Sequence, residues 1–317
     1  DRDMVKESAE MLQNEGYDVA YFTHDDLEET EDGYEIDGEQ IEALGDSTVF
    51  YAEESYLSGK REGRDENRDA LKEVERVADE FVNPVSSAEI ADDKLIAQRR
   101  MERHGINTPD LFRDHTELNS YLEEGNTAVK KSRKGSRGDG FELIDEKVEE
   151  LDEDTIYQEA IDQTDENIEE RRGFMIGDRP VAIEARSTGN DRIEPQNIAA
   201  GGEYSSVNKI SHGEVSDLRT TSRIFGEGIT AVDYFKNTET GEITVLEANK
   251  TPYTGINSHS EEDVHEEVAK HLAATRGDIE PETGLPDSIQ ELMDEPELQP
   301  DISSLFRRTP DRHSVNI

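Results

Sequence analysis

The sequence predicts an α+β protein in which a small α/β domain precedes a larger domain of mixed helices and strands. Three observations support this prediction. Segments with apolar residues at helical spacing alternate with short apolar runs that are typical of strands. A basic, glycine-containing loop at residues 132–138 lies between two of these strands. Later in the chain, carboxylate side chains interrupt two apolar strands, where a buried charge requires a partner.

The composition restricts the class of protein. The 317 residues include 78 acidic and 34 basic side chains, for a formal net charge of -44, and 32% of them are hydrophobic. Periodic apolar runs argue against disorder at this charge. A strongly hydrated acidic surface indicates a protein from a halophile. At this net charge we expect binding to neither nucleic acid nor membrane surfaces. No run of 18 apolar residues occurs, so we expect no membrane span and a cytoplasmic protein.

The chain has no cysteine, which excludes disulfides, thiolate metal sites and a cysteine nucleophile. The histidines are scattered. His259, His265 and His271 are six residues apart and do not share a helical face, so we expect them on the surface rather than at a metal site.

Residues 1–83 are expected to form the small α/β domain, although no strand precedes its first helix. Its predicted elements are a helix at 3–15, a strand at 18–22, a hairpin within 24–46 around Tyr34 and Ile36, a strand at 47–51 and a helix at 67–81. The dipeptide Asn83-Pro84 ends that helix, because the residue before proline avoids helical geometry.

Residues 84–274 are expected to form the larger domain. Its predicted helices lie at 88–105, 115–124, 214–226 and 260–274, and its predicted strands at 127–131, 140–144, 155–161, 171–176, 180–187, 229–235 and 242–249. Residues 275–317 contain five of the ten prolines, and we expect an acidic tail with one short helix at 286–293.

The basic loop is the first candidate site. Five of the eight residues from 130 to 137 are basic, and they are Lys130, Lys131, Arg133, Lys134 and Arg137, with glycines at 135, 138 and 140. Glycine lets backbone N–H groups approach an anion, and the basic side chains neutralise it. A flap that covers a polyphosphate is one interpretation, and a flexible basic turn is the other. The loop joins two strands, so it is neither a Walker A loop nor a dinucleotide fingerprint.

The second candidate site combines Asp233 with Glu247 and Asn249. Residues two apart on a strand point to one face, so Glu247 and Asn249 project together, and Asp233 on the neighbouring strand can meet them. Carboxylate and amide oxygens suit Mg²⁺. An exposed acidic strand edge is the alternative, and the apolar neighbours of both carboxylates favour the metal site.

Arg172 and Arg186 lie on the two strands of a predicted hairpin, where arginine suits anion binding. Salt bridges to the surplus acidic residues are the simpler interpretation for this pair. Glu159 ends an apolar strand, where it either caps a hinge or faces solvent.

The order of these features resembles the ATP-grasp superfamily, and most closely the RimK-type glutamate ligases, between residues 83 and 274. The residues that carry the resemblance are Asp93-Lys94, Gly105-Ile106, Pro109, Val129-Lys130, Gly135-Ser136, Gly138, Gly140, Gln158-Glu159, Arg172, Gly177, Arg186, Asn197, Gly201-Gly202, Val232-Asp233, Glu247-Ala248-Asn249 and Pro252. The resemblance implies an ATP-grasp fold, in which two α+β subdomains clamp ATP.

The resemblance also implies roles for these residues. The nucleotide-binding residues would be Lys94 and Lys130 at the phosphates, Ser136 and Gly138 in the closing loop, and Gln158 and Glu159 at an adenine hinge formed largely by backbone groups. Asp233, Glu247 and Asn249 would hold Mg²⁺, with Mn²⁺ as an alternative. Arg172, Arg186 and Asn197 would lie near the γ-phosphate and the carboxylate substrate.

The implied reaction is an ATP-dependent ligation of a carboxylate to an amine through an acylphosphate. The substrates would be a small-molecule or peptide carboxylate and an amine, glutamate or another amino acid, and a homo-oligomer is a further candidate assembly. The sequence departs from the family pattern at two positions that bear on the implied reaction. Lys131 stands where proline is usual, and Ala200 stands where arginine precedes paired glycines. An ATP-binding protein without ligase turnover is the main alternative, and an ATP-grasp kinase is another.

Overall fold

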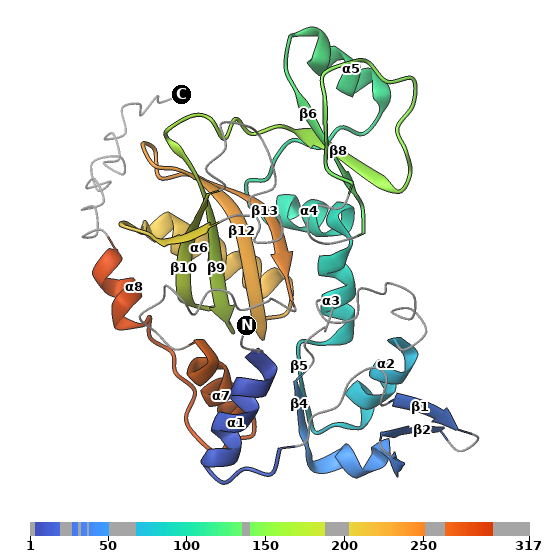
Figure 1. The fold of residues 1–317 in the computed structure, drawn as a ribbon, viewed down its shortest axis with the longest axis vertical. Coiled ribbons are helices and arrows are strands. Elements are labelled where there is room, and N and C mark those ends of the chain that lie inside the picture. Colours follow the sequence, from blue (N-terminus) through green and yellow to red (C-terminus); the bar gives the residue numbers. More distant parts are fainter. Residues whose placement is uncertain are drawn as a thin grey trace, which may run out of the picture.

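The computed structural model describes residues 4–19, 27–30, 33–36, 38–50, 68–134, 140–187, 203–250 and 264–293. Its two principal sheets stand apart in Figure 1. The larger sheet has the strand order β11-β10-β9-β12-β13, and the smaller one has the order β7-β6-β8. No helix in the described part of the chain is both long enough and apolar enough to span a membrane.

All neighbouring strands of the large sheet are antiparallel. The strands are β9 (Ile168–Ile176), β10 (Arg179–Ser187), β11 (Glu203–Ser206), β12 (Ile229–Asn237) and β13 (Ile243–Asn249). The predicted hairpin of residues 171–187 and the two predicted strands at 229–249 are confirmed. Short turns at Gly177 and Gly241, both with positive φ, allow the hairpins to close.

Helices cover the two faces of the large sheet. On one face lies α6 (His212–Ile224), which approaches closely because Gly173 has no side chain: a Cβ there would lie 3.1 Å from Leu218. On the other face, Val264 and Val268 of α7 (Val264–Thr275) pack on apolar residues of β9, β10 and β12.

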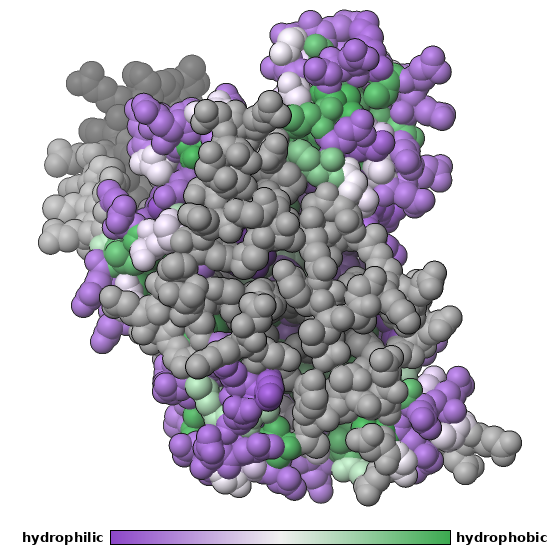
Figure 2. Space-filling view, in the orientation of Figure 1, coloured by the Kyte–Doolittle hydropathy of each residue, from purple (hydrophilic) through white to green (hydrophobic). Residues whose placement is uncertain are grey.

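The small sheet and its helix form the upper lobe in Figure 1. It consists of β6 (Ala128–Ser132), β7 (Glu142–Ile144) and β8 (Thr155–Glu159), with α5 (His115–Glu123) packed through Leu118 and Leu122. These elements confirm the strands and the helix predicted there. Figure 2 shows hydrophilic residues over most of the visible described surface, as the acidic composition predicts.

The first 83 residues contain α1 (Met4–Asn14), β1 (Leu27–Thr30), β2 (Gly33–Ile36), β3 (Glu39–Gln40), the 3-10 helix η2 (Ile41–Asp46), β4 (Thr48–Phe50), α2 (Arg68–Val77) and β5 (Glu80–Val82). The first helix and the β1–β2 hairpin are confirmed. Asp18 and Val19 form no strand, and the remainder of the strand predicted at 18–22 lies outside the described residues. The helix predicted at 67–81 ends earlier, because three residues after it form β5, a parallel partner of β4.

The single helix predicted at 88–105 is wrong, because two helices, α3 (Val85–Asp92) and α4 (Lys94–Arg103), occupy this segment. Asp93 separates them with ψ of 94°, and its carboxylate accepts a hydrogen bond from the backbone N–H of Ile96 at 3.1 Å. An aspartate that caps a new helix competes with continuation of the old one. This capping interaction is local. It was missed because the apolar residues on both sides of Asp93 keep a helical spacing, which predicts one continuous helix.

Asn83 joins the first part of the chain to the large sheet. It is fully buried with φ of 64°, its side chain donates to the Lys250 carbonyl at 2.7 Å, and it accepts from the Ile229 N–H at 2.8 Å. A Cβ at Gly228 would lie 2.7 Å from the Asn83 Oδ1 atom, so only glycine fits there. The residue that was predicted to end a helix thus connects three separate segments.

Two further expectations concern the helices near the carboxyl end. His265 is buried rather than exposed: its Nδ1 lies 3.0 Å from Glu7, and its carbonyl accepts from Ser8 at 3.1 Å, so that α1 docks on α7. The short helix predicted at 286–293 is confirmed as α8 (Asp287–Leu292), whose Ile289 packs into the main core.

Candidate active site

A row of four charged residues crosses the large sheet. The strand register places Glu184 of β10 beside Arg172 of β9, Arg172 beside Asp233 of β12, and Asp233 beside Glu247 of β13. Directly paired residues on neighbouring strands project to the same face. The sequence prediction that Asp233 and Glu247 meet is supported by this pairing, and Asn249 lies two residues further along β13.

The centre of the row is an ion pair that uses both oxygens of Asp233. The Nε and Nη2 atoms of Arg172 donate to the two oxygens at 2.7 Å each, and the Nη1 atom of Arg186 lies 3.1 Å from Asp233 Oδ1. Burial disfavours the charged carboxylate, but the two guanidinium groups outweigh it and hold the pKa of Asp233 well below its usual range. Asp233 is therefore ionised at neutral pH.

Two further carboxyl groups share this face, and the sequence did not single them out. Glu170 lies 3.5 Å from Arg186, and burial raises its pKa to about 7 despite the opposing charge of Arg186. Burial also raises the pKa of Glu184, to about 8, against the charges of Arg186 and Arg172. Their positions two residues before Arg172 and Arg186 were the available signal, because such residues share a face.

The two lysines of β6 point in different directions. Lys130 lies 3.5 Å from Glu142 on β7, and that carboxylate is 60% exposed. Lys131 faces the large sheet, since Glu247, Glu170 and Asp233 all act on its charge. Burial lowers the pKa of Lys131, and the carboxylates oppose that shift. Alternation along a strand explains the difference, because successive side chains project to opposite faces.

The base of the basic loop is attached to the start of α4. Arg133 donates from Nε to both oxygens of Asp93 at 2.9 and 3.0 Å, and the backbone N–H of Lys94 donates to the Arg133 carbonyl at 3.0 Å. Lys94 acts electrostatically on Lys131, so the two cations are near each other. The predicted loop residues Ser136 and Gly138, together with Asn197 and Ala200, lie outside the described residues.

The predicted adenine hinge has its polar groups engaged within the protein. The side chain of Gln158 is buried and donates to Gln98, which in turn donates to the Pro109 carbonyl. The backbone N–H of Glu159 donates to the Asp110 carbonyl at 2.9 Å, and burial raises the pKa of its carboxyl group. The backbone of Gln158 also pairs with Val129 and with Leu111, so both its backbone and its side-chain amide are engaged within the protein.

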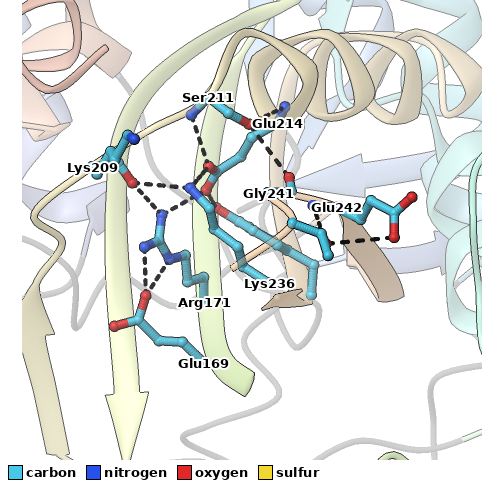
Figure 3. Close-up of polar contacts among 10 residues, drawn as sticks. Glu169, Arg171, Lys209, Ser211, Glu214, Lys236, Gly241 and Glu242 are labelled. Atoms are coloured by element: carbon cyan, nitrogen blue, oxygen red, sulfur yellow. Dashed lines mark hydrogen bonds and ion pairs between the residues drawn. The ribbon is translucent and has the colours of Figure 1, made fainter. Parts of the chain in front are cut away.

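The opposite face of the same sheet carries a second buried charged cluster (Figure 3). Glu214 of α6 is fully buried and accepts from Arg171 at 2.8 Å, from Tyr234 Oη at 2.6 Å, and from Lys236. The same carboxylate completes a capping box with Ser211. Ser-x-x-Glu was a readable signal for the cap, but the partners on β9 and β12 required the tertiary structure.

The side chains at one end of the row fit a hard cation. Asp233, Glu247 and Asn249 supply carboxylate and amide oxygens, which are the donors that Mg²⁺ accepts together with phosphate oxygens. Among the described residues, no three His, Asp or Glu side chains gather as a metal site, so an ion here would combine two carboxylates with the amide. To hold such an ion, Asp233 would have to release Arg172.

The arrangement of a three-stranded lobe opposite a charged five-stranded sheet is the ATP-grasp fold. The structure of the ATP-grasp ligase PsnB complexed with a minimal precursor superimposes with a TM-score of 0.62 at 17% identity, over 86% of this chain and 94% of that one. The macrocyclase MdnC bound with precursor peptide MdnA, from Microcystis aeruginosa MRC, gives a TM-score of 0.59 at 14% identity, over 86% and 96%.

A RimK domain ATP-grasp protein from Sphaerobacter thermophilus DSM 20745 gives a TM-score of 0.55 at 14% identity, covering 86% of this chain and 95% of that one. No model of a protein family matches the sequence, and no curated protein does. At these identities the likeness establishes the fold alone, because proteins that share a fold can differ in activity and the residues of the site determine it.

Proposed function

We propose that the chain is an ATP-dependent carboxylate–amine ligase that acts through an acylphosphate. The observation that carries the proposal is the paired charges of the large sheet, with Lys131 facing them from the small sheet. In this proposal Lys131 and Lys94 neutralise nucleotide phosphates, and Arg172 and Arg186 bind the γ-phosphoryl group and the carboxylate substrate. Mg²⁺ bound by Asp233, Glu247 and Asn249 would neutralise charge on the phosphates.

The reaction transfers the γ-phosphoryl group of ATP to a carboxylate oxygen, and ADP leaves. An amine then attacks the acyl carbon, and phosphate leaves. Positioning and charge neutralisation account for such catalysis, so no protein nucleophile is required. Two guanidinium groups on one carboxylate provide the cations for this purpose, and ATP binding would redirect them from Asp233 to the substrate anions.

The test is ADP release in concentrated KCl with Mg²⁺, ATP, hydroxylamine and a panel of amino acids and short acidic peptides. Ligase chemistry predicts ADP together with a hydroxamate, which forms when hydroxylamine intercepts the acylphosphate. ATP binding without ADP release from any pair would favour the alternative of a binding protein, which the missing cation at Ala200 supports. ADP release with a stable phosphorylated product would indicate a kinase.

The Glu247→Gln variant should lose Mg²⁺-dependent ADP release, since it removes one of the two carboxylates proposed to hold the ion. Glu150→Gln makes the same change at an exposed position and serves as the matched control. Persistent turnover in Glu247→Gln would overturn the metal assignment while leaving the ligase activity itself standing.

A further inference from the structure

The carboxylate of Glu184 lies at one end of the charged row. Within the described structure its two carboxylate oxygens accept no hydrogen bond, although the residue is only 1% exposed. By contrast, Asp233 forms ion pairs with Arg172 and Arg186, and Glu170 forms one with Arg186. Burying a polar group without a partner is costly, and a charged one more so. A ligand that brings donors to Glu184 would remove this cost.

The neighbouring arginines do not satisfy Glu184. Arg172 is its direct cross-strand partner, but the guanidinium turns to Asp233 on the other side. Arg186 shares the face two residues along β10, and it reaches Asp233 and Glu170. The charges of both arginines still act on Glu184, and burial outweighs them to raise its pKa to about 8. The site thus contains an acceptor that no cation of the described residues uses.

The position of Glu184 fits the second substrate. Glu184 and Glu247 stand at opposite ends of the row, separated by three strand spacings, or about 14 Å. The metal and phosphate groups are proposed at the Glu247 end, and the arginines lie between. An amine that attacks an acyl group held by the arginines would approach from the Glu184 end.

We propose that Glu184 binds the ammonium group of the amine substrate, which is therefore a primary alkylamine such as an amino-acid or lysine amino group. This inference rests on the proposed ligase function. An ammonium has three N–H donors, enough to satisfy both carboxylate oxygens. With its pKa at about 8, Glu184 is protonated at neutral pH without ligand, and it releases that proton to solvent as the ammonium binds. The bound ammonium then transfers one proton to the Glu184 carboxylate, and the freed nitrogen lone pair forms the C–N bond. The bond from the acyl carbon to the phosphate oxygen breaks, and the departing phosphate takes the second proton.

Binding can be measured without knowing the substrates. We would titrate the full chain with n-butylammonium chloride at constant total chloride and follow thermal stabilisation, with n-butanol as the uncharged control. Wild type and Glu150→Gln should show saturable stabilisation by butylammonium and none by butanol, and Glu184→Gln should lose the saturable phase. The proposal would be overturned if wild type showed no saturation. It would also be overturned if the apparent Kd of Glu184→Gln for butylammonium were within about twofold of the wild-type value.

A second variant separates binding from folding. Glu184→Met keeps a similar volume but has no oxygen to desolvate, so its melting temperature without ligand should rise by about 2 to 4 °C. A lower melting temperature would show that Glu184 supports the fold, which contradicts an acceptor reserved for a ligand.

Hydroxylamine then distinguishes this proposal from the ligase proposal, because it is mostly uncharged at neutral pH. In Glu184→Gln the KM for alkylamine ligation should rise at least about tenfold relative to the KM for hydroxylamine. Equal changes for both nucleophiles would overturn ammonium recognition. If wild type forms no hydroxamate with any carboxylate, the ligase proposal fails, and butylammonium binding still decides the role of Glu184.

Discussion

The guanidinium of Arg172 occupies both carboxylate oxygens of Asp233, at 2.7 Å each. These are the oxygens that the sequence assigns to Mg²⁺. If Asp233 holds a metal ion as proposed, a cation of the chain and the ion would compete for one carboxylate. In the proposed function, ATP would draw Arg172 toward its phosphates and make the oxygens of Asp233 available, so nucleotide and metal should bind cooperatively.

The Arg172→Gln variant tests this competition. Without nucleotide it should bind Mn²⁺, used as a paramagnetic probe, on the order of tenfold more tightly, since charge-assisted hydrogen bonds contribute about 1.5–3 kcal/mol. Electron paramagnetic resonance of free Mn²⁺ measures the affinity. Arg223→Gln removes an exposed pair with Asp178 and is the matched control. Equal or weaker Mn²⁺ binding in Arg172→Gln would contradict the competition.

Lys130 and Lys131 form a matched pair of substitutions on one strand. Lys131→Ala should lower kcat/KM for ATP by about 100-fold, because removing one charge-stabilising donor typically costs that much. Lys130→Ala should change it by about twofold at most, since its ammonium faces the exposed Glu142. Steady-state ADP release measures both. The reverse order would support the assignment of the nucleotide contact to Lys130.

Glu184 makes the stability of the protein depend on pH. Its folded-state pKa is raised from 4.5 to about 8, so its protonation favours the folded state. The resulting stability is fully present below pH 4.5 and is lost as the pH rises through about 8. Relative to wild type, Glu184→Gln should therefore gain unfolding free energy as the pH rises across this range. Denaturant unfolding at several pH values measures the gap, and a constant gap would contradict the shift.

Removing the charge of Glu214 should lower the stability of the protein strongly, although Glu214 lies on the face of the sheet opposite the candidate active site. Glu214→Gln leaves Lys236 buried without its counter-charge and leaves Arg171 with Glu169 alone, and it should cost about 3–5 kcal/mol of unfolding free energy. Ser211→Ala removes only the helix cap and should cost about 1 kcal/mol. Denaturant unfolding in concentrated KCl gives both values. Similar losses in the two variants would show that the cluster adds little beyond the cap.

The residues of the site differ in how readily the sequence reveals them. Asp233 and Glu247 were readable because each carboxylate interrupts an apolar strand, and the strand register places them side by side. Glu184 is more deeply buried than either, and it also interrupts an apolar stretch, between Ile183 and Ala185, so the same signal was present and was not used. Lys130 and Lys131 could not be distinguished for another reason. They are neighbours on one strand, and a shift of its register by one residue would move each side chain to the other face of the sheet.

Local patterns also misled at Asp93 and at Asn83. Apolar spacing continued through Asp93, although its carboxylate caps a new helix and holds Arg133 at the base of the loop. Asn83 looked like a helix terminator before proline. Its buried side chain instead bridges Ile229 and Lys250, which are more than a hundred residues away in the chain. Neither role can be inferred without knowing which segments meet.

The sequence by itself determined most of the strands and helices, the basic loop and the order of chemical groups that resembles ATP-grasp ligases. Those features depend on period, composition and spacing along the chain. Only the tertiary structure decided which charges pair: Arg172 with Asp233 rather than with Glu184, and Lys131 rather than Lys130 toward the large sheet. Pairing depends on strand register and on competition among nearby partners, and both arise only when distant segments pack together.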